Sequence, residues 1–191
     1  MYDYLSLADG NAVPYGIYDL VHSSGFVNVG IDHDTAELAV ESIRRWWHSV
    51  GKDLYPGSHE LLIIADGGGS NGARNRLWKR QLQHLATETR LSITVCHLPP
   101  ATSKWNKIEH RLFSCISIKW RAKPLTSLET GIALISHTTT ARCGLHVTAI
   151  KDSQTYPTGI IVTDAQLEVL KIVRDPFHGE WNSIINPQDP P

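Results

Sequence analysis

The sequence has no long hydrophobic run and few cysteines among its 191 residues. No apolar stretch approaches the roughly 20 residues that a membrane-spanning helix requires, so we expect no membrane partner. Residues 1–4 lack the basic start and the apolar stretch of a signal peptide. The three cysteines, Cys96, Cys115 and Cys143, show no metal-ligand spacing and cannot all pair with one another. A reducing, cytoplasmic location is the simplest interpretation.

Two common ligand-binding motifs are also missing. No lysine follows the last glycine of the segment 67–72, so this glycine-rich segment is not a phosphate-binding loop of the Walker type. No two histidines have a spacing typical of a metal site. Four histidines remain candidates for proton transfer or phosphate contact: His97, His110, His137 and His178.

Basic residues are concentrated in the middle of the chain. The formal net charge of −1 argues against a nucleic-acid partner. However, residues 74–123 hold eleven of the eighteen lysines and arginines and only two acids, Glu88 and Glu109, whereas residues 1–73 hold three basic residues and ten acids. This block is consistent with a surface that binds a phosphate backbone. A solvated basic helix face would give the same pattern, so both interpretations stay open.

The predicted elements alternate between strands and helices. Aromatic and β-branched runs at 15–20 and 25–31, parted by turn residues, predict a hairpin. The run 61–65 is apolar at every position, which predicts a central strand covered on both faces. Residues 91–98 predict another strand, which Pro99 ends. Capping residues and helical periodicity predict helices over 35–50, 73–89, 105–120 and 127–138. The order indicates a layered mixed α/β domain.

Two carboxylates, Asp66 and Glu109, occupy unusual positions. Asp66 ends the apolar run and opens into glycines, at the strand end where open α/β sheets bind ligands. Glu109 is an acid among cations on a predicted helix. Turn capping by Asp66 and a solvated helix face around Glu109 are the simpler alternatives. If both side chains reached one Mg²⁺ ion, they would support phosphodiester chemistry.

The residues around Glu109 combine positive charge with a stacking surface. Asn106 lies three positions before Glu109 and is expected on the same helical face. Lysine and arginine side chains can hold a polyanion next to a metal ion. The predicted DNA contacts are Lys104, Trp105, Asn106, Lys107 and Arg111.

Residues 65–72 and 103–114 together closely resemble the Rhodopirellula-type DDE transposases of bacterial insertion sequences. Further matches at 31–36, 42–47 and 177–182 extend the resemblance over nearly the whole chain. The resemblance implies an α/β fold, a ribonuclease H-like mixed sheet flanked by helices. It also implies cutting and joining of DNA at transposon ends with Mg²⁺ or Mn²⁺. The implied partners are DNA and other transposase subunits.

The resemblance also implies a domain plan and roles for the two acids. Residues 1–150 would form the catalytic domain and residues 151–191 a C-terminal extension. Asp66 would be the second catalytic acid and Glu109 the third, and both would bind the metal. The strand that carries the first aspartate belongs before the hairpin, and we expect it to be missing. Asp3, Asp9 and Asp19 are early enough to replace that aspartate, but none lies in a matching context.

We therefore expect a fragment of a DDE transposase catalytic domain that is inactive alone. Two alternatives stay open. The chain could be a non-catalytic DNA-binding or oligomerising fragment that interferes with an intact transposase. It could also be the product of a decayed pseudogene, in which the missing strand leaves apolar surface exposed.

Overall fold

The computed structural model describes residues 12–99, 102–120, 127–137 and 145–189. The chain divides into two compact units, each built from two separate stretches of sequence. Unit 1 comprises the chain up to Asp34 and Lys104–Tyr156. Unit 2 comprises Thr35–Ser103 and the chain from Pro157 onward.

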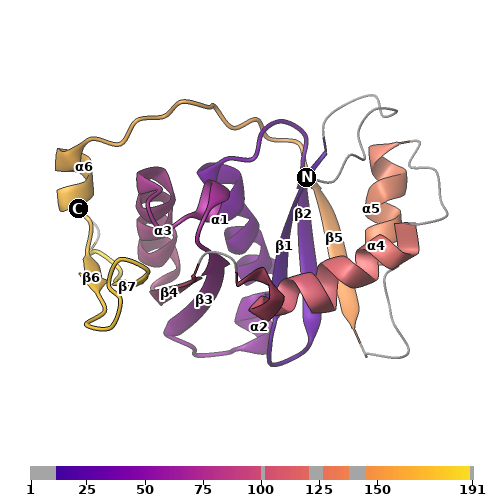
Figure 1. Ribbon diagram of the computed structural model, residues 1–191, viewed down its shortest axis with the longest axis horizontal. Coiled ribbons are helices and arrows are strands. Elements are labelled where there is room, and N and C mark those ends of the chain that lie inside the picture. The colour runs from indigo at the N-terminus through magenta and orange to yellow at the C-terminus, as the bar shows by residue number, and fades with distance from the viewer. Residues whose placement is uncertain (1–11, 100–101, 121–126, 138–144, 190–191) are drawn as a thin grey trace. The chain divides into compact units, whose positions relative to one another are not determined.

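Unit 1 contains a three-stranded mixed sheet in the order β1-β2-β5 (Figure 1). Strands β1 (Val13–Asp19) and β2 (Ser24–Gly30) are antiparallel, which confirms the predicted hairpin. Asp19 closes the turn, because its carboxylate accepts hydrogen bonds from the backbone N–H groups of Val21 and His22 at 2.9 and 3.0 Å. Strand β5 (His146–Asp152) runs parallel to β2.

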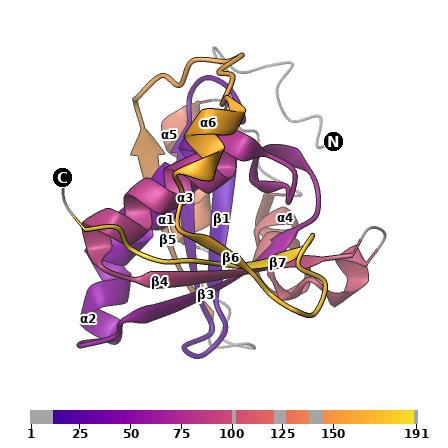
Figure 2. The same cartoon turned by 90° about the vertical axis from the view of Figure 1, so that its left-hand side faces the viewer.

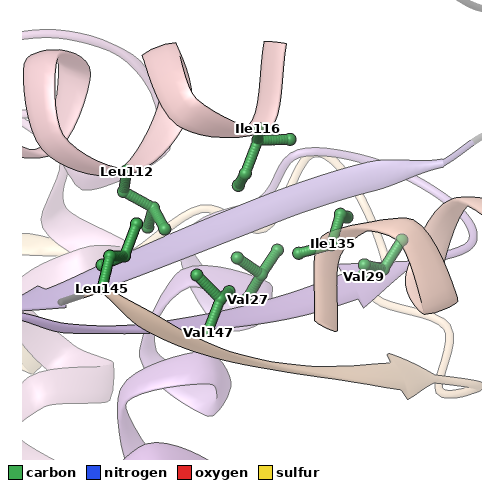
Figure 3. Packing of buried hydrophobic residues seen from close by; sticks show 7 residues of the cluster. All are labelled: Val27, Val29, Leu112, Ile116, Ile135, Leu145 and Val147. Atoms are coloured by element: carbon green, nitrogen blue, oxygen red, sulfur yellow. The ribbon is translucent and has the colours of Figure 1, made fainter. Parts of the chain in front are cut away.

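Helices cover one face of this sheet with apolar side chains. They are a wide helical turn at Glu109–Phe113 (η4), α4 (Ser114–Trp120) and α5 (Leu128–Ser136), and a short turn at Ser103–Trp105 (η3) precedes them along the chain. Figure 3 shows the resulting core, in which side chains from the helices meet β2 and β5. Its buried members are Val27, Val29, Leu112, Ile116, Ile135, Leu145 and Val147.

Unit 2 contains a four-stranded mixed sheet in the order β3-β4-β7-β6. Strand β3 (Glu60–Asp66) runs parallel to β4 (Ser92–Leu98). Strand β7 (Asn182–Ile185) pairs antiparallel with β4, and β6 (Ile172–Arg174) pairs antiparallel with β7. The C-terminal part of the chain thus completes the sheet that begins near residue 60.

Two long helices, α1 (Ala36–Trp46) and α3 (Arg76–Thr89), pack against each other in unit 2 (Figure 2). Helix α3 contacts β4 and β7, and its apolar stripe includes the fully buried Leu82 and Leu85. Helix α1 continues through η1 (Trp47–Gly51) into α2 (Lys52–Leu54). No described helix has the length and apolarity to cross a bilayer.

The remaining elements of unit 2 are short. A tight turn, η2 (Gly69–Asn71), follows β3, and α6 (Asp164–Glu168) precedes β6. Thr163 starts α6 with the reciprocal side-chain hydrogen bonds of a capping box. Helix α1 is capped by Thr35, whose side chain accepts a hydrogen bond from the Leu38 N–H.

The prediction that β3 is a central strand covered on both faces is wrong for the described part of the chain. Strand β3 is at the edge of its sheet, and Leu62 and Ile64 are 59% and 46% exposed. Successive strand residues point to opposite faces, so Leu61 and Ile63 are half-buried while Leu62 and Ile64 face away. The apolar sequence of β3 indicates that both of its faces could be buried, but its described neighbours cover only one of them.

The core of unit 1 gives a direct test of this packing. Replacing the fully buried Leu112 with alanine removes contacts to β2 and β5 and leaves a cavity. We expect Leu112→Ala to lower the free energy of unfolding by about 2–5 kcal/mol, measured by urea denaturation. The matched control is Ile118→Ala on α4, where the side chain is 65% exposed. Equal destabilisation by the two variants would contradict the packing described for unit 1.

Candidate metal-binding and DNA-binding residues

Asp66 is the last residue of β3, and its side chain is exposed. The loop after it turns back tightly: a Cβ atom at Gly72 would lie 3.2 Å from the backbone of Gly68. Gly69 has a φ of +74°, a conformation that glycine adopts without strain. A Cβ atom at Gly68 or Gly69 would meet nothing within 4 Å. The loop that follows Asp66 therefore keeps its outer side open.

His97 anchors this loop from the end of the neighbouring strand β4. Its Nε2 atom lies 2.8 Å from the carbonyl oxygen of Asn71, and its Nδ1 atom lies 2.9 Å from the carbonyl oxygen of Trp181. A ring protonated on both nitrogens donates to both carbonyls, whereas a neutral ring donates to one of them. The sequence placed His97 among the candidates for proton transfer. In the structure it is buried, and both of its nitrogens contact backbone oxygens.

Asn75 holds the other end of the loop. Its side-chain nitrogen donates to the Ser70 carbonyl at 2.9 Å, and its side-chain oxygen accepts from the Trp78 backbone N–H at 3.2 Å. The second bond caps α3. Asn75 and His97 thus fix the path of the chain from Asp66 to α3.

Glu109 begins the wide turn η4 of unit 1 and is half-buried. The helix starts at Lys107 rather than at the predicted Trp105. Asn106 precedes it, is 8% exposed, and accepts a long hydrogen bond of 3.4 Å from the Ile108 N–H. Asn106 therefore lies before the first turn of the helix and does not share a helical face with Glu109, although the sequence predicted that it would.

The four other predicted DNA contacts are exposed: Lys104, Trp105, Lys107 and Arg111. The Lys104 ammonium lies 5.3 Å from the centre of the Trp105 ring, within the range of a cation–π contact. The Lys104 carbonyl also lies 2.8 Å from Nε2 of His110, which ties the preceding turn to the helix.

The structure contains a buried carboxylate that the sequence did not single out. Asp152, at the end of β5, is fully buried. It accepts hydrogen bonds from Asn28 at 3.1 Å, from the Tyr156 hydroxyl at 2.7 Å and from the Gln154 N–H at 3.0 Å. Buried charges require such partners. Asp152 therefore links β2, through Asn28, to the end of β5 and to the segment 154–156 that follows it.

Asp66 belongs to unit 2 and Glu109 to unit 1. Within the described ranges, no three acidic, histidine or cysteine side chains gather as a metal site. Taken by itself, Asp66 suits a hard cation, since it presents carboxylate oxygens at an open loop and Mg²⁺ retains several waters when bound.

The role of His97 as a loop anchor can be tested by hydrogen exchange. Removing its ring takes away the side-chain contact to the Asn71 carbonyl, a loss of about 1–3 kcal/mol, whereas the Trp181 carbonyl keeps its bond from the His97 backbone N–H. We therefore expect His97→Ala to accelerate amide exchange across residues 69–75. His84→Ala is the control, because His84 is exposed on α3. If exchange in this loop were the same in both variants, His97 would not be its anchor.

Comparison with known proteins identifies the family of the chain. A family model described as the Rhodopirellula transposase DDE domain matches residues 1–187. Searches of curated proteins and of solved structures returned no match. The two mixed sheets with flanking helices are compatible with a ribonuclease H-like fold. Because the match covers nearly its whole length, the chain belongs to the Rhodopirellula transposase DDE domain family.

Proposed function

We propose that Asp66 and Glu109 are two of the metal-binding catalytic acids of a transposase that cleaves and joins DNA. Membership of the DDE family supports a transposase function. The observation that carries the proposal is the position of Asp66, exposed at the carboxyl end of β3 and followed by an open glycine loop. Ligands of α/β sheets bind at such strand ends.

The two carboxylates would hold Mg²⁺ or Mn²⁺ through oxygen atoms, the ligands that these ions prefer. A bound ion would polarise the phosphodiester and activate a water or a hydroxyl group. The protein's own contribution is to position the acids. His97 and Asn75 fix the loop behind Asp66, and the helical turn η4 carries Glu109.

The exposed residues around Glu109 are proposed to hold the DNA backbone. Lys104, Lys107 and Arg111 supply positive charge, and Trp105 offers a ring on which an unpaired base can stack. Asn106 is buried at the start of the helix, so its proposed role is to position these exposed side chains.

We further propose that the chain is inactive alone. Asp66 and Glu109 are two of the three acids that the DDE pattern requires, and a site with two of three acids should bind metal weakly and support little strand transfer. A chain that binds DNA and such subunits without cleaving DNA would interfere with an intact transposase, which is the second candidate function.

Metal binding by Asp66 is testable with the purified chain. We expect Asp66→Asn to weaken Mn²⁺ binding at least about tenfold, the lower end of what even the partners of metal ligands contribute. Isothermal titration calorimetry or Mn²⁺ relaxation would measure it. Glu60→Gln is the matched control, because Glu60 is an exposed acid at the opposite end of β3. Equal Mn²⁺ affinity of the two variants would show that Asp66 is not a metal ligand.

The proposed inactivity has its own test. We expect the isolated chain to leave a labelled transposon-end duplex uncut in Mn²⁺, and to bind that duplex equally well after the double change Asp66→Asn and Glu109→Gln. Gel analysis of the products and fluorescence anisotropy measure the two properties. Mn²⁺-dependent cleavage that the double variant abolishes would refute inactivity and leave the assignment of the two acids intact.

A further inference from the structure

Unit 2 contains a shallow pocket that is separate from Asp66. It is open to solvent, and its cavity volume is about 20 Å³. Helix α3 contributes Lys79 to the wall, β6 contributes Arg174, and β7 contributes Ser183. His97 and Trp181 also line it.

Sheet pairing places two of these side chains together. Arg174 and Ser183 are direct partners in the antiparallel pair β6–β7, so their side chains point to the same face. The turn that joins the two strands is tight at Gly179, where a Cβ atom would lie 2.6 Å from the Asp175 carbonyl oxygen. A guanidinium and a hydroxyl group therefore share one wall of the pocket.

At this pocket the Lys79 ammonium is partly buried and lies near two other positive charges. Burial lowers its pKa, and the positive charges of Arg174 and Arg76 lower it further. Arg76 is paired with Asp164 at 2.6 Å. Neither Lys79 nor Arg174 has an ion pair with any carboxylate in the described ranges. Two cations that form no ion pair with a described carboxylate therefore line one pocket.

The one acid that lines the pocket does not neutralise them. Glu180 is exposed, and its carboxylate contacts Nδ1 of His178 at 3.0 Å. The His178 ring stacks on Trp181, with ring centres 5.2 Å apart. Glu180 is therefore directed to His178 on its own turn.

We propose that this pocket binds a phosphate group, contacted by Lys79, Arg174 and Ser183, and that its natural source is a backbone phosphate of DNA. An anion there would relieve the repulsion between the two cations. The site does not require metal or the acids Asp66 and Glu109. Its DNA ligand, however, rests on the transposase function proposed above.

The first experiment measures DNA binding in EDTA by fluorescence anisotropy between 50 and 200 mM salt. The test variant Lys79→Met keeps most of the buried aliphatic stem and removes the charge. Loss of one phosphate contact should reduce the slope of log K against log salt by about 0.9. Lys52→Ala, an exposed cation on α2, should leave the slope unchanged. Asp66→Asn should also keep the wild-type slope, so failure of the metal site would not be mistaken for failure of this pocket.

The second experiment measures thermal unfolding with sodium phosphate or sodium chloride at equal ionic strength. Without phosphate, Lys79→Met should unfold at the same or a higher temperature than the wild type, because it relieves repulsion. Phosphate should stabilise the wild type and Lys52→Ala but not Lys79→Met. Equal stabilisation of all three proteins, or no effect of phosphate on any, would overturn the pocket as an anion site. A lost phosphate effect with an unchanged DNA slope would overturn DNA as its ligand.

Discussion

The imidazole of His97 is the contact on which the proposed chemistry of unit 2 depends. It joins three parts of the chain that are distant in sequence: the end of β4, the loop after Asp66 and the turn before β7. The loop behind the candidate metal ligand and the strand that carries Ser183 are therefore fixed by one side chain. Because His97 is buried, these bonds form in an environment where an unmet carbonyl is costly.

The basic block seen in the sequence is divided by the fold. Residues 74–90 belong to unit 2, whereas Lys104, Lys107 and Arg111 belong to unit 1. In unit 2, Arg76 is neutralised by Asp164, and Lys79 remains beside Arg174. In unit 1 the cations are exposed around Glu109. The basic block at 74–123 is therefore divided in the fold into groups of cations with different surroundings. The sequence alone does not reveal which of these cations form ion pairs.

The sequence predicted what depends on near neighbours. The hairpin β1–β2 and the strand β4 follow from turn residues and side-chain patterns a few residues long. The sequence did not predict features that depend on contacts between distant segments of the chain. The edge position of β3 depends on which strands pair with it, and the pocket depends on Lys79 and Arg174, which are 95 residues apart. Asp66 and Glu109 were found because their local settings are unusual, but the fold assigns them to different units.

The chain passes between the two units three times, and this affects how it can fold during synthesis. Strand β2 obtains its parallel partner β5 only 122 residues later (Ser24 with His146), and Ile93 of β4 pairs with Ile185 of β7, 92 residues later. Pairing over such separations is slow, and strand edges that wait unpaired are open to wrong partners. Unit 1 therefore has all of its described strands only once β5 has been synthesised, and unit 2 only once β7 has been synthesised. Until these strands pair, the edges of β2 and β4 are exposed sites for aggregation.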